Sequence, residues 1–209
     1  MEIMKRICFI NTALCFILLA AMLFTGCHKG NTPSVDPTQS ADVTATPAST
    51  QDDDTAKYQL GPNGAFEDEY ITANWYPTLS LSRVVMNFAE YAGTTEDGEK
   101  LLFSYTVDDL GSFDEELGGH DHDSYQQLLF SQNSYYYLDE FSYEKVDGHT
   151  ALRALYRYAP AEEPDRVVYV LQYAYNVNGW IMSMVYTSLS PLPAECEETL
   201  KAVKFKKGY

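Results

Sequence analysis

Two histidines alternate with two aspartates in the short segment His120-Asp121-His122-Asp123. Imidazole nitrogens and carboxylate oxygens are ligands that zinc and other divalent transition ions accept from proteins. The pair Gly118-Gly119 stands directly before the segment, and a glycine-rich loop loses conformational entropy when it orders around an ion. No CxxC or HExxH motif accompanies the histidines. Two hypotheses therefore stand: a divalent-metal site at these four residues, or a solvated acidic loop that leads into a helix.

Aromatic side chains follow one face of a predicted strand and continue after the next turn, at Tyr169, Tyr173, Tyr175 and Trp180. A tyrosine offers a flat apolar ring and a hydroxyl, which suit contact with a protein or with a polymer of the cell envelope. Strands also favour tyrosine for ordinary cross-strand packing, and alternation does not tell which face of a sheet is covered. These four residues are thus a candidate binding face, with core packing as the alternative.

The sequence contains little evidence of a catalytic site. Cys196 lies near the start of a predicted helix, where a thiolate is favoured, but it shares a helix face with Leu200 and Val203 and is expected to be buried. No Gly-x-Ser-x-Gly motif is present, and acidic residues are so numerous that a pair at glycosidase spacing would arise by chance. We assign no catalytic residue and no required cofactor, and we expect a protein without enzymatic activity.

The N-terminus has the features of an export signal. Lys5 and Arg6 precede an apolar run over residues 7–24, and Thr25 and Gly26 follow it directly before Cys27. A charged region, an apolar region and small residues at a cut site are typical of a secretory signal peptide. The apolar run is also close to the length that spans a bilayer, so an uncleaved anchor is the alternative. Either way, the residues that follow lie outside the cytoplasm.

The segment Phe24-Thr25-Gly26-Cys27 resembles a bacterial lipobox, with Phe24 in a place where leucine is usual. The resemblance implies cleavage after Gly26 and attachment of diacylglycerol to the Cys27 sulfur. Residues 1–26 would then be a lipoprotein signal peptide, and Cys27 would anchor the chain in the lipid bilayer of the cell membrane.

Residues 27–56 form a predicted tether. The stretch over residues 31–55 has no aromatic residue and is rich in Pro, Ser, Thr and Asp, a composition that cannot offset the entropy of ordering. About 25 residues of such a chain span roughly 25–30 Å. Residues 57–209 are then one globular domain, whose length suits a single apolar core. The formal net charge of −16 repels phosphate groups, so nucleic acid is excluded as a partner.

Three dipeptides predict hairpin turns: Asp97-Gly98, Asp147-Gly148 and Asn178-Gly179. Asn or Asp followed by Gly adopts positive φ at both central turn positions at the least steric cost. The segments on either side of these turns alternate in polarity, as strands do. Residues 84–91 and 100–107 form a less clear strand pair around Asp97-Gly98, and a helix over residues 84–91 is the alternative, because their apolar positions also suit a period near 3.6. Arg153 and Arg157 alternate with apolar neighbours and are expected to be solvated or paired with acids.

Two helices are predicted in the same half of the chain. The first covers Ser124–Gln132, with Ser124 as its N-cap. The second covers Pro193–Val203, with proline at its start, glutamates in its first half and lysines at its end, which matches the helix dipole. Its apolar face should pack on the sheet. Antiparallel strands with helices packed on them make the expected fold α+β.

The order of these elements resembles the Mog1/PsbP-like α/β/α sandwich domains that occur in many bacterial lipoproteins. The resemblance covers mainly residues 124–206 and includes the segments Val146–Arg153, Asn178-Gly179-Trp180 and Leu200–Phe205. It implies an accessory or binding role and assigns no active-site residues. The sequence hypothesis is therefore a lipid-anchored, extracytoplasmic binding module for a protein or an envelope polymer. The alternative is an extracytoplasmic metal-binding protein that uses His120–Asp123.

Overall fold

The computed structural model describes residues 53–159, residue 163 and residues 166–209. The predicted signal peptide, the predicted lipidation residue Cys27 and the predicted tether as far as residue 52 lie outside the described residues. The last residues of the predicted tether form a short helix, α2 (Asp53–Ala56). Across the described ranges, no helix combines the length and the apolar character that crossing a bilayer needs.

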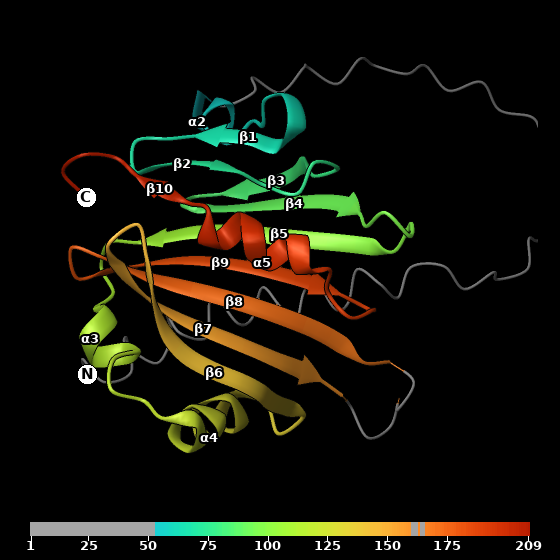
Figure 1. Cartoon of the computed structure of the whole chain (residues 1–209), viewed down its shortest axis with the longest axis vertical. Coiled ribbons are helices and arrows are strands. Elements are labelled where there is room, and N and C mark those ends of the chain that lie inside the picture. Colours follow the sequence, from blue (N-terminus) through green and yellow to red (C-terminus); the bar gives the residue numbers. More distant parts are fainter. Residues whose placement is uncertain (1–52, 160–162, 164–165) are drawn as a thin grey trace, which may run out of the picture.

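Within the described residues, seven antiparallel strands form a long sheet in the order β3-β4-β5-β9-β8-β7-β6 (Figure 1). Their bounds are β3 (Ser80–Val85), β4 (Phe88–Thr94), β5 (Lys100–Asp108), β6 (Tyr136–Val146), β7 (His149–Tyr158), β8 (Val168–Val177) and β9 (Trp180–Ser188). After β5 the chain passes through α3 (Phe113–Glu116) and α4 (His122–Gln132) and returns at the far edge as β6. Strand β9 then fills the place between β8 and β5.

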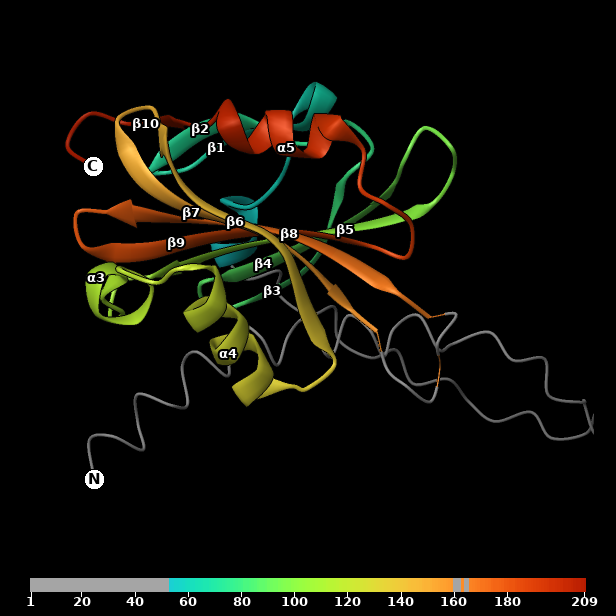
Figure 2. The same cartoon turned by 60° about the horizontal axis from the view of Figure 1, so that its bottom comes forward.

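A smaller sheet and one helix cover one face of the long sheet. The small sheet has the order β1-β2-β10, with β1 (Ala65–Glu67), β2 (Ile71–Asn74) and β10 (Lys204–Phe205), and a short 3-10 turn, η1 (Pro62–Gly64), precedes it. Figure 2 shows this sheet and α5 (Ala194–Lys201) on one side of the long sheet, and α3 and α4 on the other. Each side encloses its own apolar cluster. The expected α+β fold, a largely antiparallel sheet with helices packed on it, is confirmed.

The turns predicted at Asp147-Gly148 and Asn178-Gly179 are confirmed. Both residues of each pair have positive φ, at 49° and 91° in the first turn and 54° and 94° in the second. At Asp97-Gly98, which joins β4 to β5, Gly98 is the member of the pair with positive φ, at 82°. A turn that was not predicted, at Met86-Asn87, divides residues 84–91 between β3 and β4. The residues on both sides of this turn are apolar, so the polarity pattern of the sequence did not indicate it.

The two predicted helices are present with shifted starts. Helix α5 begins at Ala194, with Pro193 as its N-cap residue, and its apolar residues Cys196 and Leu200 are fully buried. Burial also raises the pKa of the Cys196 thiol to about 12, which does not suit a nucleophile. Helix α4 begins at His122 rather than at Ser124.

Acidic side chains hold the two arginines of β7, as expected. Arg153 donates two hydrogen bonds to the Glu197 carboxylate of α5, at 2.8 and 3.0 Å, and a third to Glu140 of β6 at 2.8 Å. Arg157 makes three contacts with Asp139, between 2.7 and 3.1 Å. The Arg153–Glu197 pair joins α5 to the sheet.

Candidate binding site

The predicted metal segment forms the start of α4. The Asp121 carboxylate accepts a hydrogen bond from the Ser124 backbone N–H at 2.8 Å, and the Ser124 hydroxyl accepts one from the Asp121 N–H at 2.9 Å. This reciprocal pair is a capping box, with Asp121 rather than Ser124 as the N-cap. The hydrogen bonds from Ser124 lower the pKa of Asp121.

The two imidazoles of the segment have different partners. His120 has one ring nitrogen 3.2 Å from the Ser124 hydroxyl and the other 3.3 Å from the Glu116 carbonyl oxygen, whereas His122 contacts Asp123 at 3.4 Å. In the part of the chain that the structure describes, no three His, Cys, Asp or Glu side chains are placed to hold a metal ion. The metal-site hypothesis is corrected accordingly: these residues begin a helix.

The predicted aromatic face is largely enclosed by α5. Tyr173 and Tyr175 have no exposed surface. The Tyr175 hydroxyl donates to the Leu200 carbonyl oxygen of α5 at 2.8 Å, and the Tyr173 hydroxyl donates to Glu144 at 3.1 Å. Tyr173 and Tyr175 therefore belong to the core, as the alternative had it, and not to a binding face.

The other two residues of that face lie at opposite ends of the β8–β9 hairpin. Tyr169 pairs with Ser188, far from the turn, and lines an apolar groove of about 390 Å³ beside residues 191–193. Trp180 lies next to the turn, with its ring centroid 6.0 Å from that of Tyr70 and 6.2 Å from that of Tyr209. Both side chains are partly exposed. The four residues therefore do not make one contact surface.

A small pocket lies beside Tyr70, where the β1–β2 turn, the β3–β4 turn and the end of β5 meet. Its volume is about 220 Å³. Three carboxylates and two tyrosines contribute to its wall, and the lining residues are Lys57, Tyr58, Asp68, Glu69, Tyr70, Asn87, Val107 and Asp109. We call this site the acidic-aromatic pocket.

Asp68 is fixed in position by three donors. One carboxylate oxygen accepts the backbone N–H groups of Tyr70 and Ile71 at 2.8 and 2.9 Å. The other accepts the Tyr105 hydroxyl at 2.5 Å. Burial and the neighbouring Asp68 raise the pKa of Tyr105 well above its usual value, so this hydroxyl remains a neutral donor. Three neutral donors thus hold the Asp68 carboxylate at the pocket wall.

The two tyrosines present different environments. Burial, the charge of the adjacent Glu69 carboxylate and a hydrogen bond with it together raise the pKa of Tyr70 to about 12. The buried Tyr58 has the Lys57 ammonium nitrogen 5.0 Å from its ring centroid. A cation of the chain itself therefore already lies over an aromatic ring of this pocket.

Two exposed apolar residues adjoin the lining residues in sequence. Met86 and Leu110 are each 81% exposed and are sequence neighbours of the lining residues Asn87 and Asp109. The Asn87 side-chain amide donates to the Val107 carbonyl oxygen, which ties the β3–β4 turn to the end of β5. The pocket thus has a charged and aromatic wall with an apolar rim.

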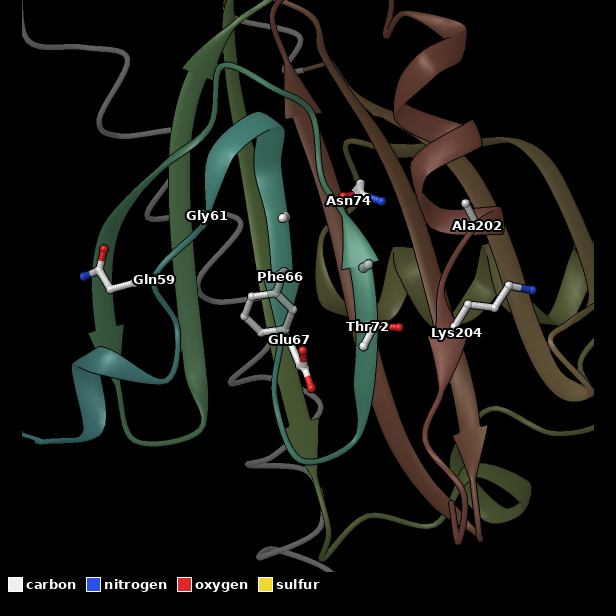
Figure 3. Close-up of a pocket in the computed structure, with 10 residues that line it drawn as sticks. Gln59, Gly61, Phe66, Glu67, Thr72, Asn74, Ala202 and Lys204 are labelled. Atoms are coloured by element: carbon white, nitrogen blue, oxygen red, sulfur yellow. The ribbon is translucent and has the colours of Figure 1, made fainter.

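A larger depression of about 500 Å³ lies on the outer side of the small sheet. Figure 3 shows Gln59 on one side of β1 and Lys204 on the other side of β2, so their polar ends do not converge. The charged ends are also paired elsewhere, because Lys204 contacts Asp147 at 3.0 Å and Lys206 contacts Glu67 at 2.7 Å. This open surface is the weaker candidate despite its size.

The residues of the acidic-aromatic pocket did not emerge from sequence reasoning. They come from four separate segments, which only the tertiary fold brings together. Two short acidic runs, Glu67-Asp68-Glu69 and Asp108-Asp109, were the available indication, because each lies at a strand end. Trp180 was named as a candidate, and it adjoins the pocket through Tyr70.

No protein-family model and no curated protein sequence matches the chain. Among solved structures, the Ran-binding protein Mog1p of Saccharomyces cerevisiae is similar, with 14% identity and a TM-score of 0.45 over 64% of this chain and 88% of that one. A Pseudomonas aeruginosa protein of unknown function is 12% identical, with a TM-score of 0.36 over 59% of this chain and 90% of that one. These likenesses concern the arrangement of strands and helices alone.

A protein from Bacteroides thetaiotaomicron is 8% identical, with a TM-score of 0.44 over 73% of this chain. The chain spans 50% of the length of that protein. Mog1p, from the family that the sequence resemblance named, is thus one of the structures similar to this chain.

Proposed function

We propose that the chain is a lipid-anchored, non-enzymatic binding module on the extracytoplasmic side of a membrane, and that it contacts a partner protein through the end of the sheet that holds the acidic-aromatic pocket. The observation that carries the proposal is the pocket flanked by Met86 and Leu110, each 81% exposed. Large apolar side chains exposed beside aromatic and charged groups are typical of contact surfaces.

The size of the pocket supports a macromolecular partner. Pockets for free small molecules generally have volumes of about 300–1,000 Å³. A volume of about 220 Å³ suits one long side chain inserted from a larger molecule. The apolar rim then contacts the neighbours of that side chain.

Site-specific photo-crosslinking in cells that produce the full chain tests this proposal. A photoreactive residue replaces Leu110 at the rim in one variant and Leu189, an exposed leucine after β9, in a matched control. We expect a discrete protein adduct from position 110 and none of that mass from position 189. Identical adducts from both positions, or none from position 110, would contradict the proposed contact surface.

The membrane anchor has its own test. Cys27→Ala removes the only sulfur at the lipobox-like boundary, so the chain should remain as unlipidated precursor or be released as soluble protein. Fractionation and mass determination of the processed chain distinguish these outcomes from lipidation. A Cys27→Ala chain with the mass and membrane retention of the parent protein would reject lipidation at this residue.

A further inference from the structure

We infer that the acidic-aromatic pocket receives the guanidinium or ammonium group of a basic side chain on the partner protein. This inference rests on the proposed function, since it names the chemical group that the contact surface recognises. The charges, the aromatic rings and the rim of the pocket each support it.

The charge balance of the wall favours a cation. Asp68, Glu69 and Asp109 contribute carboxylates, and Lys57 is the one basic residue among the described residues that line the pocket. All three donors that hold Asp68 are neutral, namely two backbone N–H groups and the Tyr105 hydroxyl. They orient the carboxylate without compensating its charge. A basic group of a partner would compensate it in a partly desolvated place, where such an interaction is stronger than in water.

The tyrosine rings give the same indication. A cation within about 6 Å of an aromatic ring centroid is attracted by the negative face of the ring. The Lys57 nitrogen lies 5.0 Å from the Tyr58 centroid, so an ammonium group of the chain itself already uses this ring. Tyr70 supplies a second ring at the wall, supported by Trp180 and Tyr209 behind it.

The nature of the site favours an organic cation over a metal ion. Within the described residues, no cluster of three candidate ligands is placed to hold a metal, and two oxygens of the pocket wall are already committed on Asp68. A free small amine would leave the exposed Met86 and Leu110 without a role. A protein can offer both a basic side chain, which pairs with the carboxylates of the wall, and apolar neighbours, which contact Met86 and Leu110.

Isothermal titration calorimetry of the full chain in mild detergent tests this inference with two blocked peptides. One peptide carries a single arginine between leucines, and the other carries citrulline at that position, which keeps the shape and removes the charge. We expect the arginine peptide to bind at least about tenfold more tightly, because cation–π contact and charge-assisted hydrogen bonds together exceed the roughly 1.4 kcal/mol that a tenfold change requires. Equal affinities would overturn the inference.

Paired variants locate the binding. Glu69→Gln with Asp109→Asn removes two charges from the pocket, whereas Glu96→Gln with Asp97→Asn removes two exposed charges from the β4–β5 turn at the opposite end of the strands. We expect the first variant to lose roughly five- to tenfold in affinity for the arginine peptide and the second to lose less than about twofold. Equal losses would place the binding elsewhere and reject the pocket.

The peptide titration and the cross-linking experiment test the recognition of a cation and the proposed protein contact separately. If position 110 forms a protein adduct in cells but the arginine and citrulline peptides bind equally, the contact surface stands and the recognition of a cation is wrong. If the arginine preference is present and depends on Glu69 and Asp109, but position 110 forms no adduct, the pocket chemistry stands and the proposed protein contact is wrong.

Discussion

The ion pair between Arg153 and Glu197 supports a quantitative prediction about how α5 is held on the sheet. Arg153 has 11% of its side chain exposed and reaches both Glu197 oxygens. Lys201 also contacts Glu197 at 2.6 Å. Glu197→Gln preserves the shape of the side chain and removes its charge, while Glu140 continues to pair with Arg153. The variant therefore isolates the contribution of one carboxylate.

The lowered pKa of Glu197 gives the size of the expected loss in unfolding free energy. The hydrogen bonds from Arg153 dominate and lower this pKa from 4.5 to about 2, against the opposing effect of burial. At about 1.36 kcal/mol per pKa unit, this displacement corresponds to an upper bound of about 3 kcal/mol in unfolding free energy. Glu197 has 26% of its side chain exposed, and solvent screening reduces the effect. We expect Glu197→Gln to lose about 1.5–2 kcal/mol at pH 7.

The same pKa predicts the pH dependence of that loss. Because the folded pKa is below the unfolded value, the carboxylate stabilises the fold fully above pH 4.5, and this contribution disappears as the pH falls toward 2. The parent protein therefore loses stability over this window, whereas the Glu197→Gln variant lacks that component. The difference between the two proteins should shrink toward zero near pH 2.

Urea denaturation followed by far-ultraviolet circular dichroism at pH 7, 4 and 2.5 measures these differences. The control is Glu198→Gln, which makes the same charge change at an exposed position of α5. It should change the unfolding free energy by less than about 0.5 kcal/mol at pH 7. A Glu197→Gln loss no larger than that of the control, or a loss that is as large at pH 2.5 as at pH 7, would refute the reasoning.

Three further predictions concern single residues. Leu200→Ala should lose about 2–5 kcal/mol in unfolding free energy, because this leucine of α5 is fully buried, and a loss below about 1 kcal/mol in chemical denaturation would argue against that packing. Asp121→Ala should destabilise the protein through the missing cap of α4, with Asp121→Asn close to the parent protein; two equal losses would contradict a capping role. The Cys196 thiol, with its pKa raised to about 12, should resist iodoacetamide at pH 8 in the native state and react in urea, as peptide mass mapping can measure; fast native labelling would contradict its burial.

Sequence reasoning worked best where the information is local. The turn at Asn178-Gly179 follows from the backbone preferences of two adjacent residues, and the alternation along β7 correctly separated Arg153 and Arg157 from the apolar face. The start of α4 was predicted two residues too late and its N-cap three residues too late, because Asp121 and Ser124 are both good cap residues. Only the observed geometry shows that the aspartate caps the helix and the serine completes the box.

The candidate site could not be predicted from local sequence patterns. Tyr173 and Tyr175 alternate as an exposed strand face would, but α5 returns from later in the chain and covers them. The acidic-aromatic pocket joins the segments around Tyr58, Asp68 and Asn87 with the end of β5. Such proximity depends on strand order and on the turn at Met86-Asn87, neither of which follows from local periodicity.

Hydrogen–deuterium exchange of the full chain, with and without the partner protein recovered by cross-linking, tests most directly where that partner binds. We expect partner-dependent protection at residues 66–70, 85–89 and 107–111, which surround the acidic-aromatic pocket, and unchanged exchange at the α4 cap over residues 120–124. Protection confined to residues 155–157 and 191–193, at the apolar groove beside Tyr169, would contradict the account and move the contact surface to the other end of the sheet.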